Sequence, residues 1–252
     1  MNTDIPISIV ESLRSYAERF ETADFIVGDP SWFMHQVSGR DNQEVMGFVA
    51  QAVSYGSRKQ FMPKIQRLLD CSGGDMVRWI SEGAFNDVVP NDQSCFYRLY
   101  TNATMNSFLT ACQSMLSRYG SIGDFVRENS SDGLSAVRAL TSFFANQGSM
   151  GVVPRNASSS CKRLCMFLRW MVRSHSPVDL GHWSDFLDRR TLIMPMDVHV
   201  VRQSVGFGLL GSSTTSMSAA LRLTDSMRQV FPDDPLKGDF ALFGLGIEQS
   251  EH

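Results

Sequence analysis

The chain has 252 residues, of which 43% are hydrophobic, and its formal net charge is −3 at pH 7. This length provides for one large domain or two small lobes with a buried core, and the hydrophobic fraction excludes an intrinsically disordered chain. No apolar run in the sequence approaches the roughly 18–20 residues that cross a bilayer, and the first residues lack the basic start of a secretory signal. We therefore expect a globular, cytoplasmic protein without a membrane partner.

Helical spacing of apolar residues runs through most of the chain. It predicts helices over residues 8–20, 41–56, 58–70, 102–120, 131–148, 158–173, 196–211, 214–231 and 238–246. Asp41 and Glu44 have the spacing of a capping box, and Pro63 is expected near a helix start. Gly120 and Gly148 are expected to end helices. The segments FIVGDP and GVVP are too short to be convincing strands.

The predicted fold class is therefore all-α. Residues 1–252 are expected to form one compact helical unit with two lobes. The first lobe is predicted over about residues 40–177, and the second combines about residues 1–39 with residues 178–252.

The five cysteines are an odd number, and among them only Cys161 and Cys165 are close in sequence. This arrangement favours reduced thiols, and two cysteines four residues apart in a helix are typical of core packing. A zinc site would need a second cluster of Cys or His at ligand spacing, which the sequence lacks. We therefore expect no metal.

One long stretch of the sequence contains no acidic residue. Between Gly133 and Val178 there is no Asp or Glu, whereas the same stretch holds Arg138, Arg155, Lys162, Arg163, Arg169 and Arg173. A local field of one sign steers an anionic partner more effectively than the net charge does. The stretch indicates an anion-binding surface, and a chance gap in acids is the alternative.

Lys162 lies at an unfavourable position for a lysine. It falls at the start of the helix predicted over 158–173, where the positive end of the helix dipole repels a cation. The dipole and the nearby charges of Arg163 and Arg169 disfavour the ammonium and favour the neutral amine, which is a nucleophile. The alternative is a lysine that points into water.

Asp197 is predicted to cap a helix. Pro195 ends the preceding segment, and Asp197 then stands at the N-cap position before Val198. A carboxylate fixed at a helix start can hold a lysine, accept its proton or stabilise a cationic sugar. The alternative is a purely structural cap, and His199 is expected to be structural or solvent-facing.

Four segments carry a resemblance to a known family, namely CKRLCMFLRWMVR (161–173), LIMPMDVHVVRQ (192–203), DPLKGDFALFGLGI (234–247) and DNQEVMGFVAQAVSYGSRKQ (41–60). Through these segments the chain resembles an uncharacterised bacterial family that is related to the helix–hairpin–helix DNA glycosylases. Among characterised proteins, the family is most similar to the archaeal 8-oxoguanine DNA glycosylases. The resemblance covers the chain from about residue 40 to its end.

The resemblance implies a fold and a pair of catalytic residues. The implied fold has two helical lobes, with a damaged base flipped into the cleft between them. In these enzymes a lysine opens the second helix of the hairpin and an aspartate caps a later helix, and Lys162 and Asp197 match these positions. The lysine attacks the anomeric carbon, and the aspartate helps to deprotonate it and stabilises the oxocarbenium-like transition state. The resulting Schiff base can undergo β-elimination.

The hairpin segment departs from the family pattern. The family's hairpin glycines, whose N–H groups hold a phosphate, are missing from VVPRNASSSCKRL. Serine hydroxyls and nearby basic side chains are expected to replace them. The predicted DNA contacts are Arg58, Lys59, Arg155, Ser159, Ser160, Arg163 and Arg169.

The base pocket also departs from the pattern. Met166 stands where the archaeal enzymes place an aromatic residue that stacks on the base. Phe167, Trp170 or Tyr55 are therefore expected to line the pocket together with Met166. A role in the core is the alternative for each of the three aromatic residues.

These observations lead to three hypotheses. The first is a monomeric DNA glycosylase/β-lyase of base excision repair, which excises an oxidised purine similar to 8-oxoguanine from duplex DNA without any cofactor. The second is a non-catalytic DNA-binding protein of the same fold, which would bind with a steep salt dependence. The third is a helical protein-interaction module in which Lys162 and Asp197 are only a surface residue and a cap.

Overall fold

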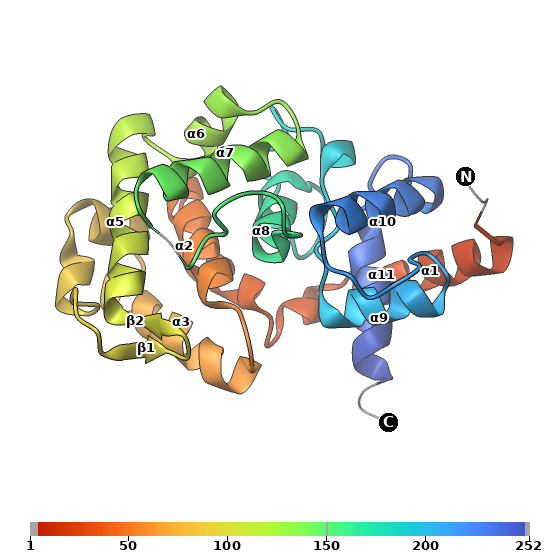
Figure 1. Ribbon diagram of the computed structural model, residues 1–252, viewed down its shortest axis with the longest axis horizontal. Coiled ribbons are helices and arrows are strands. Elements are labelled where there is room, and N and C mark those ends of the chain that lie inside the picture. The colour runs from red at the N-terminus through yellow and green to blue at the C-terminus, as the bar shows by residue number, and fades with distance from the viewer. Residues whose placement is uncertain (1–4, 150, 250–252) are drawn as a thin grey trace. The chain divides into compact units, whose positions relative to one another are not determined.

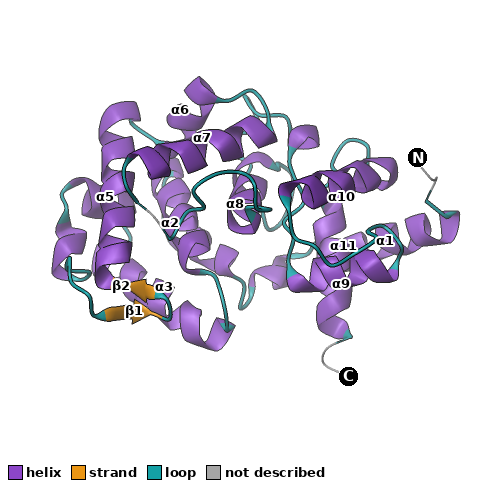
Figure 2. Cartoon of the chain, in the orientation of Figure 1, coloured by secondary structure: helices purple, strands orange, loops and turns teal. Residues whose placement is uncertain are grey.

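The computed structural model describes residues 5–149 and 151–249. In this part of the chain helices predominate, and the β-structure is one short hairpin (Figures 1 and 2). The predicted all-α class is therefore confirmed in its coarse form. The hairpin consists of β1 (Cys95–Tyr97) and β2 (Tyr100–Thr101), which pair antiparallel. It was not predicted, because strands this short show no alternating pattern.

The chain divides into two compact units. Unit 1 combines the described residues up to Phe25, residues 132–134, and the described residues from Ser158 on, whereas unit 2 comprises residues 26–131 and 135–157. This division differs from the predicted lobes, which placed the segment up to residue 177 with the middle of the chain. As a consequence, Lys162 and Asp197 belong to the same unit.

Unit 1 is built around its last helix. Its elements are α1 (Ile7–Phe20), α8 (Lys162–Val172), the 3₁₀ helix η4 (Arg189–Thr191), α9 (Val198–Gly206), α10 (Met217–Val230) and α11 (Lys237–Glu248). Helix α11 packs against both α1 and α9. Two glycines permit this close packing: a Cβ at Gly244 would lie 2.2 Å from the Phe20 ring, and one at Gly246 would lie 2.5 Å from Cβ of His199.

Unit 2 packs around α2 (Arg40–Val53), which is buried from Glu44 to Val53. The other elements are the 3₁₀ helices η2 (Pro30–Gln36) and η3 (Ala84–Asp87), the β1–β2 hairpin, α3 (Arg58–Ser72), α4 (Met76–Ser81), α5 (Asn102–Tyr119), α6 (Ile122–Asn129) and most of α7 (Gly133–Asn146). The 3₁₀ helix η1 (Ala23–Ile26) crosses from unit 1 into unit 2. The Phe48 ring contacts those of Phe108 on α5 and Phe144 on α7, and these contacts join three helices.

The predicted helix ends are correct in some places and wrong in others. Gly120 follows the last residue of α5 with φ 86°, as predicted, whereas α7 ends at Asn146, two residues before Gly148. Pro63 lies inside α3 rather than near its start. The predicted capping box is wrong, because α2 begins at Arg40 with Gly39 as its N-cap and no side-chain cap.

Glu44 has a different role from the predicted one. Its side chain is buried, and Oε2 accepts a hydrogen bond from the backbone N–H of Gly123 at 2.9 Å. Gly123 lies in the first turn of α6, so Glu44 supplies an acceptor to a helix start far along the chain. The carboxylate also lies 3.4 Å from Nε of Arg40.

Glu44→Ala is expected to lower the free energy of unfolding by about 1–3 kcal/mol, because it leaves a buried N–H without its acceptor. Urea denaturation followed by circular dichroism measures the change. The matched control is Glu82→Ala, which removes an exposed carboxylate paired with Arg78 one helical turn away and should have little effect. Equal losses for the two variants would contradict the role of Glu44.

Candidate active site

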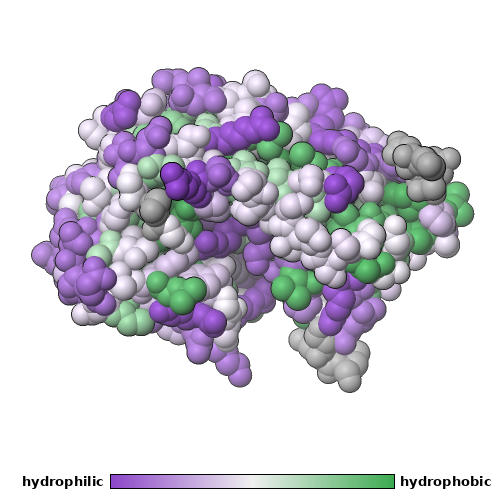
Figure 3. Space-filling view, viewed as in Figure 1, coloured by the Kyte–Doolittle hydropathy of each residue, from purple (hydrophilic) through white to green (hydrophobic). Residues whose placement is uncertain are grey.

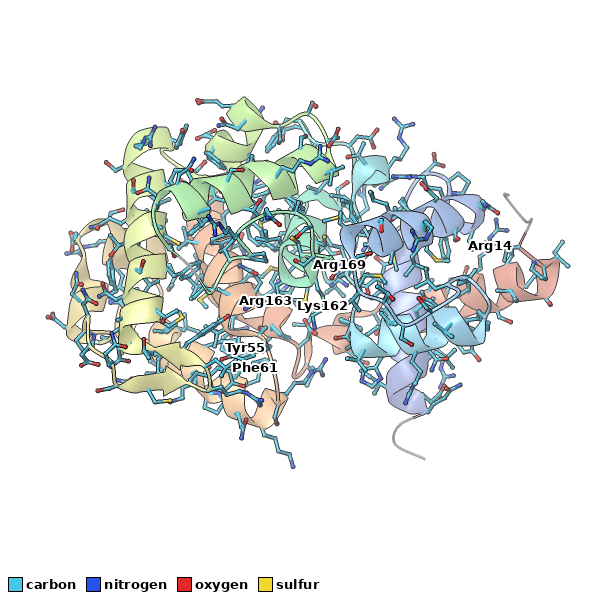
Figure 4. All side chains as sticks on the ribbon, in the orientation of Figure 1. Arg14, Tyr55, Phe61, Lys162, Arg163 and Arg169 are labelled. Atoms are coloured by element: carbon cyan, nitrogen blue, oxygen red, sulfur yellow. The ribbon has the colours of Figure 1, made fainter. Side chains whose placement is uncertain are left out.

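Helix α8 begins with Lys162 after an unusual N-cap. The N-cap residue Cys161 has φ 47° and ψ 38°, in the left-handed region that residues other than glycine rarely adopt, and no side chain caps the helix. The Cys161 side chain is buried, and the carbonyl of Cys161 accepts from the backbone N–H of Cys165 at 3.0 Å. Lys162 is therefore the first helical residue, in the predicted first turn but on a helix that starts later than predicted (Figure 4).

Helix α9 begins after Asp197, whose N-cap position is confirmed. Its Oδ1 accepts a hydrogen bond from the backbone N–H of His199 at 3.0 Å. This cap fixes the carboxylate at the start of α9. The His199 ring is half-buried, lies edge-on to the Phe243 ring at 5.7 Å between centroids, and has no hydrogen-bond partner for its buried Nδ1.

The structure brings together the two residues to which the resemblance assigns catalysis. Nζ of Lys162 donates a hydrogen bond to Oδ2 of Asp197 at 3.0 Å. One carboxylate oxygen thus caps α9 while the other binds the lysine at the start of α8. The side chains of Lys162 and Asp197 are 34% and 25% exposed, so solvent can still reach the pair.

The charge of Asp197 explains how a lysine is tolerated at a helix N-terminus. Burial opposes ionisation of the carboxyl, but the Lys162 ammonium and the N–H of His199 outweigh burial and hold the pKa of Asp197 below its ordinary value. The carboxylate next to Lys162 offsets the repulsion by the helix dipole. The resting pair is therefore an ion pair.

The predicted anion-binding surface of residues 133–178 does not include the two later arginines of α8. Arg169 is 3% exposed and Arg173 is 1% exposed. Their guanidinium groups bind carboxylates from other segments of unit 1, namely Glu21, Asp179, Asp234 and Asp239. The stretch without acids thus supplies the cations of a buried ion network, and the buried Arg169 is not available as a DNA contact.

Most of the predicted base-pocket residues have structural roles. Phe167 and Trp170 are fully buried, and the Phe167 ring lies edge-on to that of Trp183 at 5.3 Å. Tyr55 is half-buried in unit 2, where its hydroxyl donates to the carbonyl of Tyr97 at 2.9 Å. The predictions that Phe167 and Trp170 line a base pocket are therefore corrected, because both side chains pack in the core. Met166 is half-buried and stays a candidate.

The remaining predicted DNA contacts differ in exposure. Ser160 is buried, so its hydroxyl is a poor phosphate donor and the prediction that it contacts DNA is corrected. Its backbone carbonyl accepts a hydrogen bond from the Cys165 thiol. Arg163 is the second residue of α8 and is half-buried. The exposed candidates are Arg58, Lys59, Arg155 and Ser159.

Asp239 is a neighbour of the site that sequence reasoning missed. It is buried in the first turn of α11 and binds the Arg169 guanidinium. Burial raises the pKa of Asp239 to about 6 against the opposing effect of Arg169, and the negative charge of Asp197 adds to the rise. The ion network therefore reaches the lysine–aspartate pair electrostatically. The signal that the sequence offered for this residue was Asp239 itself, the single acid in the mostly apolar segment 236–247.

This shift predicts that Asp239 stabilises the fold increasingly as the pH falls. The carboxyl takes up a proton near pH 6 in the folded state and near pH 4 in the unfolded chain, so the folded state binds more protons between these values. The wild type is compared with Asp239→Asn. The difference between their free energies of unfolding, wild type minus variant, should rise by roughly 1–3 kcal/mol as the pH falls from 7 to 4.5. Urea titrations of both proteins across this range measure the difference, and a flat difference contradicts the prediction.

The cysteines of α8 and its N-cap pack in the core and take no part in the site. Cys161 and Cys165 are buried free thiols, as the predicted core packing requires, and burial raises their pKa values.

Among residues 5–149 and 151–249, no three His, Cys, Asp or Glu side chains are grouped so that they could hold a metal ion. No helix in this part of the chain is long and apolar enough to cross a membrane.

The fold and the site define a mostly helical protein with a lysine–aspartate pair at two helix N-termini. The chain matches the family described as "Protein of unknown function (DUF2400)" over residues 29–248, and it belongs to that family. Comparisons with curated proteins and with solved structures find no match. The matched region contains both Lys162 and Asp197.

Proposed function

We propose that the protein is a DNA glycosylase with associated AP lyase activity, which removes an oxidised purine similar to 8-oxoguanine from duplex DNA as a monomer. The observation that carries this proposal is the 3.0 Å contact between Nζ of Lys162 and Oδ2 of Asp197. These two residues match the nucleophile and the aspartate of the helix–hairpin–helix glycosylases. The proposal includes a fold of that type, with α8 as the second helix of the hairpin.

The proposed reaction uses the Lys162 amine as a nucleophile. Nζ attacks C1′ of the damaged nucleotide while the bond from C1′ to the base nitrogen breaks, and the base leaves with a proton. Opening of the sugar ring then gives a Schiff base between Nζ and C1′. Removal of a proton from C2′ breaks the C3′–O bond, so the strand is cleaved by β-elimination. The scheme uses no metal or organic cofactor.

The proposed task of Asp197 is to change the protonation of Lys162 and to stabilise the sugar cation. A substrate that covers the pair excludes water, and two separated charges are costly in a medium of low dielectric constant. The proton on Nζ is then transferred to Oδ2, which leaves a neutral amine next to a neutral acid. As the bond to the base breaks, Asp197 gives this proton to the departing base nitrogen, and the carboxylate that results stabilises the positive charge that develops on the sugar.

A DNA partner is supported by the charge of α3 in unit 2. The helix carries Arg58, Lys59, Lys64 and Arg67, and it has no acid before Asp70. Arg58, Lys59 and Arg67 are exposed and Lys64 is half-buried. Basic side chains gathered on one helix provide the phosphate contacts from which most non-specific DNA affinity comes.

The hairpin segment favours the second hypothesis, a DNA-binding protein without turnover. Residues 147–161 separate α7 from α8, and the segment from Val152 to Cys161 contains no glycine. The glycines that would let backbone N–H groups approach a phosphate closely are therefore lacking there. Ser159 and Arg163 are the proposed replacements.

Borohydride trapping tests the proposal. The protein is mixed with a duplex that contains one 8-oxoguanine or one abasic site, with and without reductant, and the adduct is digested and sequenced by mass spectrometry. We expect a reductant-dependent adduct on the peptide that contains Lys162. Binding of the duplex without any adduct would support the DNA-binding hypothesis. Absence of both would leave the protein-interaction hypothesis.

A further inference from the structure

The tip of the β1–β2 hairpin presents one apolar side chain to solvent. Leu99 is 88% exposed, more than any other large apolar side chain in the described part of the chain. It forms the two-residue turn together with Arg98, whose φ of 51° lies in the region that hairpin turns usually fill with glycine. Single exposed leucines are common, but one held on a strained turn is not.

The turn is braced by hydrogen bonds to Tyr55. The Tyr55 hydroxyl accepts from the backbone N–H of Leu99 at 3.1 Å and donates to the carbonyl of Tyr97 at 2.9 Å. In return, the Tyr97 hydroxyl donates to the carbonyl of Tyr55 at 2.6 Å. The Arg98 guanidinium lies 5.8 Å from the centroid of the Tyr55 ring. Leu99 is therefore held outward on a rigid support.

Cations surround this tip. Gly56 adjoins Arg98 so closely that a Cβ there would lie 2.7 Å from Nη1 of Arg98, and α3 with its four basic residues begins two positions later. Nζ of Lys64 on the same helix lies 5.9 Å from the Phe96 ring centroid on β1. Hydrophobic groups over the hairpin are bordered by hydrophilic ones in Figure 3.

The acids that contact this surface are engaged with other groups, and Asp70, the exposed acid near the end of α3, accepts a hydrogen bond from Gln66 at 2.7 Å. Asp29 is buried and lies 3.5 Å from Arg58. Asp92 accepts from the backbone of Ser94 and from the side chain of Asn102 at the base of the hairpin. The charge that faces outward from Arg98 and α3 is therefore positive.

We infer that Leu99 is a finger that inserts between base pairs of duplex DNA, while Arg98 and the basic residues of α3 hold the flanking phosphates. The inference rests on the proposed function and assigns its DNA-opening step to unit 2. Apolar side chains that enter a base stack unstack one step and kink the duplex, and phosphate contacts offset this cost. A protein partner would require a larger contiguous apolar area than one leucine among cations provides.

The test uses a duplex with 2-aminopurine next to an abasic site, because 2-aminopurine fluoresces more strongly when it is unstacked. Wild-type protein should raise the fluorescence on binding. Leu99→Ala should reduce this rise at least about threefold and weaken binding about tenfold, with the salt dependence unchanged because no charge is lost. Leu99→Met should restore most of the rise. The control is Ile7→Ala on α1, which removes another exposed apolar side chain (77% exposed) and should change neither quantity.

The outcomes separate this inference from the proposed function. Unstacking requires no chemistry, so a rise that depends on Leu99 upholds the finger even when no covalent adduct forms at Lys162. An undiminished rise in Leu99→Ala overturns the finger and leaves the glycosylase proposal intact. Absence of DNA binding by the wild-type protein at low salt overturns both the finger and the glycosylase proposal, and the protein-interaction hypothesis is then left for the hairpin.

Discussion

Lys162→Gln is expected to abolish the borohydride-trapped adduct, with a fall of about 10³-fold or more in the rate of base release. The glutamine side chain can still donate a hydrogen bond to Asp197, so the cap of α9 stays in place. It has no amine that could attack C1′, and no Schiff base can form. Trapping on an abasic-site duplex and base release from an 8-oxoguanine duplex measure the two losses.

The matched control for this variant is Lys237→Gln. Like Lys162, Lys237 is the first residue of a helix in unit 1; it is more exposed than Lys162, and no contact with Asp197 is found for it in the described part of the chain. Its replacement should leave both the adduct and base release unchanged. An adduct that persists in Lys162→Gln, or one that disappears in Lys237→Gln, would contradict the assignment of the nucleophile.

The helix-terminal positions of the site could be predicted because they depend on local rules. Asp197 precedes a run of helical spacing and follows Pro195, which is the pattern of an N-cap, and the structure confirms it. Lys162 lies in a first turn, as predicted. The contact between the two side chains is not a local property. It spans 35 residues and was suggested only by the family resemblance.

The burial of the arginines on α8 could not be predicted from spacing. Charged residues are normally assigned to the exposed side of a helix, and both arginines were therefore counted in the predicted anion-binding surface. Their partners are Asp179 in the loop after α8 and, from distant segments, Glu21 just after α1, Asp234 before α11 and Asp239 on α11, and no local pattern in α8 reveals them. The stretch without acids was a correct observation, but the acids that neutralise it come from other segments.

The hairpin that carries Leu99 was invisible for a related reason. Its turn has Arg98 where a glycine or an asparagine would have signalled a two-residue hairpin. The strained conformation is stabilised by Tyr55, which lies more than forty residues earlier. Tertiary contacts therefore override local propensity both at the ion network and at the hairpin tip.

The ion network around Arg173 fixes the helix that carries Lys162. Nε of Arg173 donates to Asp234 at 2.9 Å, Nη2 donates to Glu21 at 2.7 Å, and Nη1 donates to Asp179. Burial opposes the charge of the guanidinium, but these carboxylates outweigh burial and raise the pKa of Arg173 above its ordinary value. The C-terminal end of α8 is thereby tied to α1 and to the segment before α11.

Arg173→Met is therefore expected to lower the free energy of unfolding by about 3–5 kcal/mol, because it roughly keeps the volume but leaves the buried Asp179 and Asp234 and the half-buried Glu21 without their shared cation. Urea denaturation measures the loss, and soluble yield at 37 °C reports it when the variant is too unstable to titrate. Arg228→Met is the control, since its pair with Asp225 on α10 is exposed and should contribute little. An equal loss of stability in Arg173→Met and Arg228→Met would contradict this prediction, and it would mean that the three carboxylates become neutral when Arg173 is absent. If the network positions α8, Arg173→Met should also slow adduct formation at temperatures where the variant is still folded.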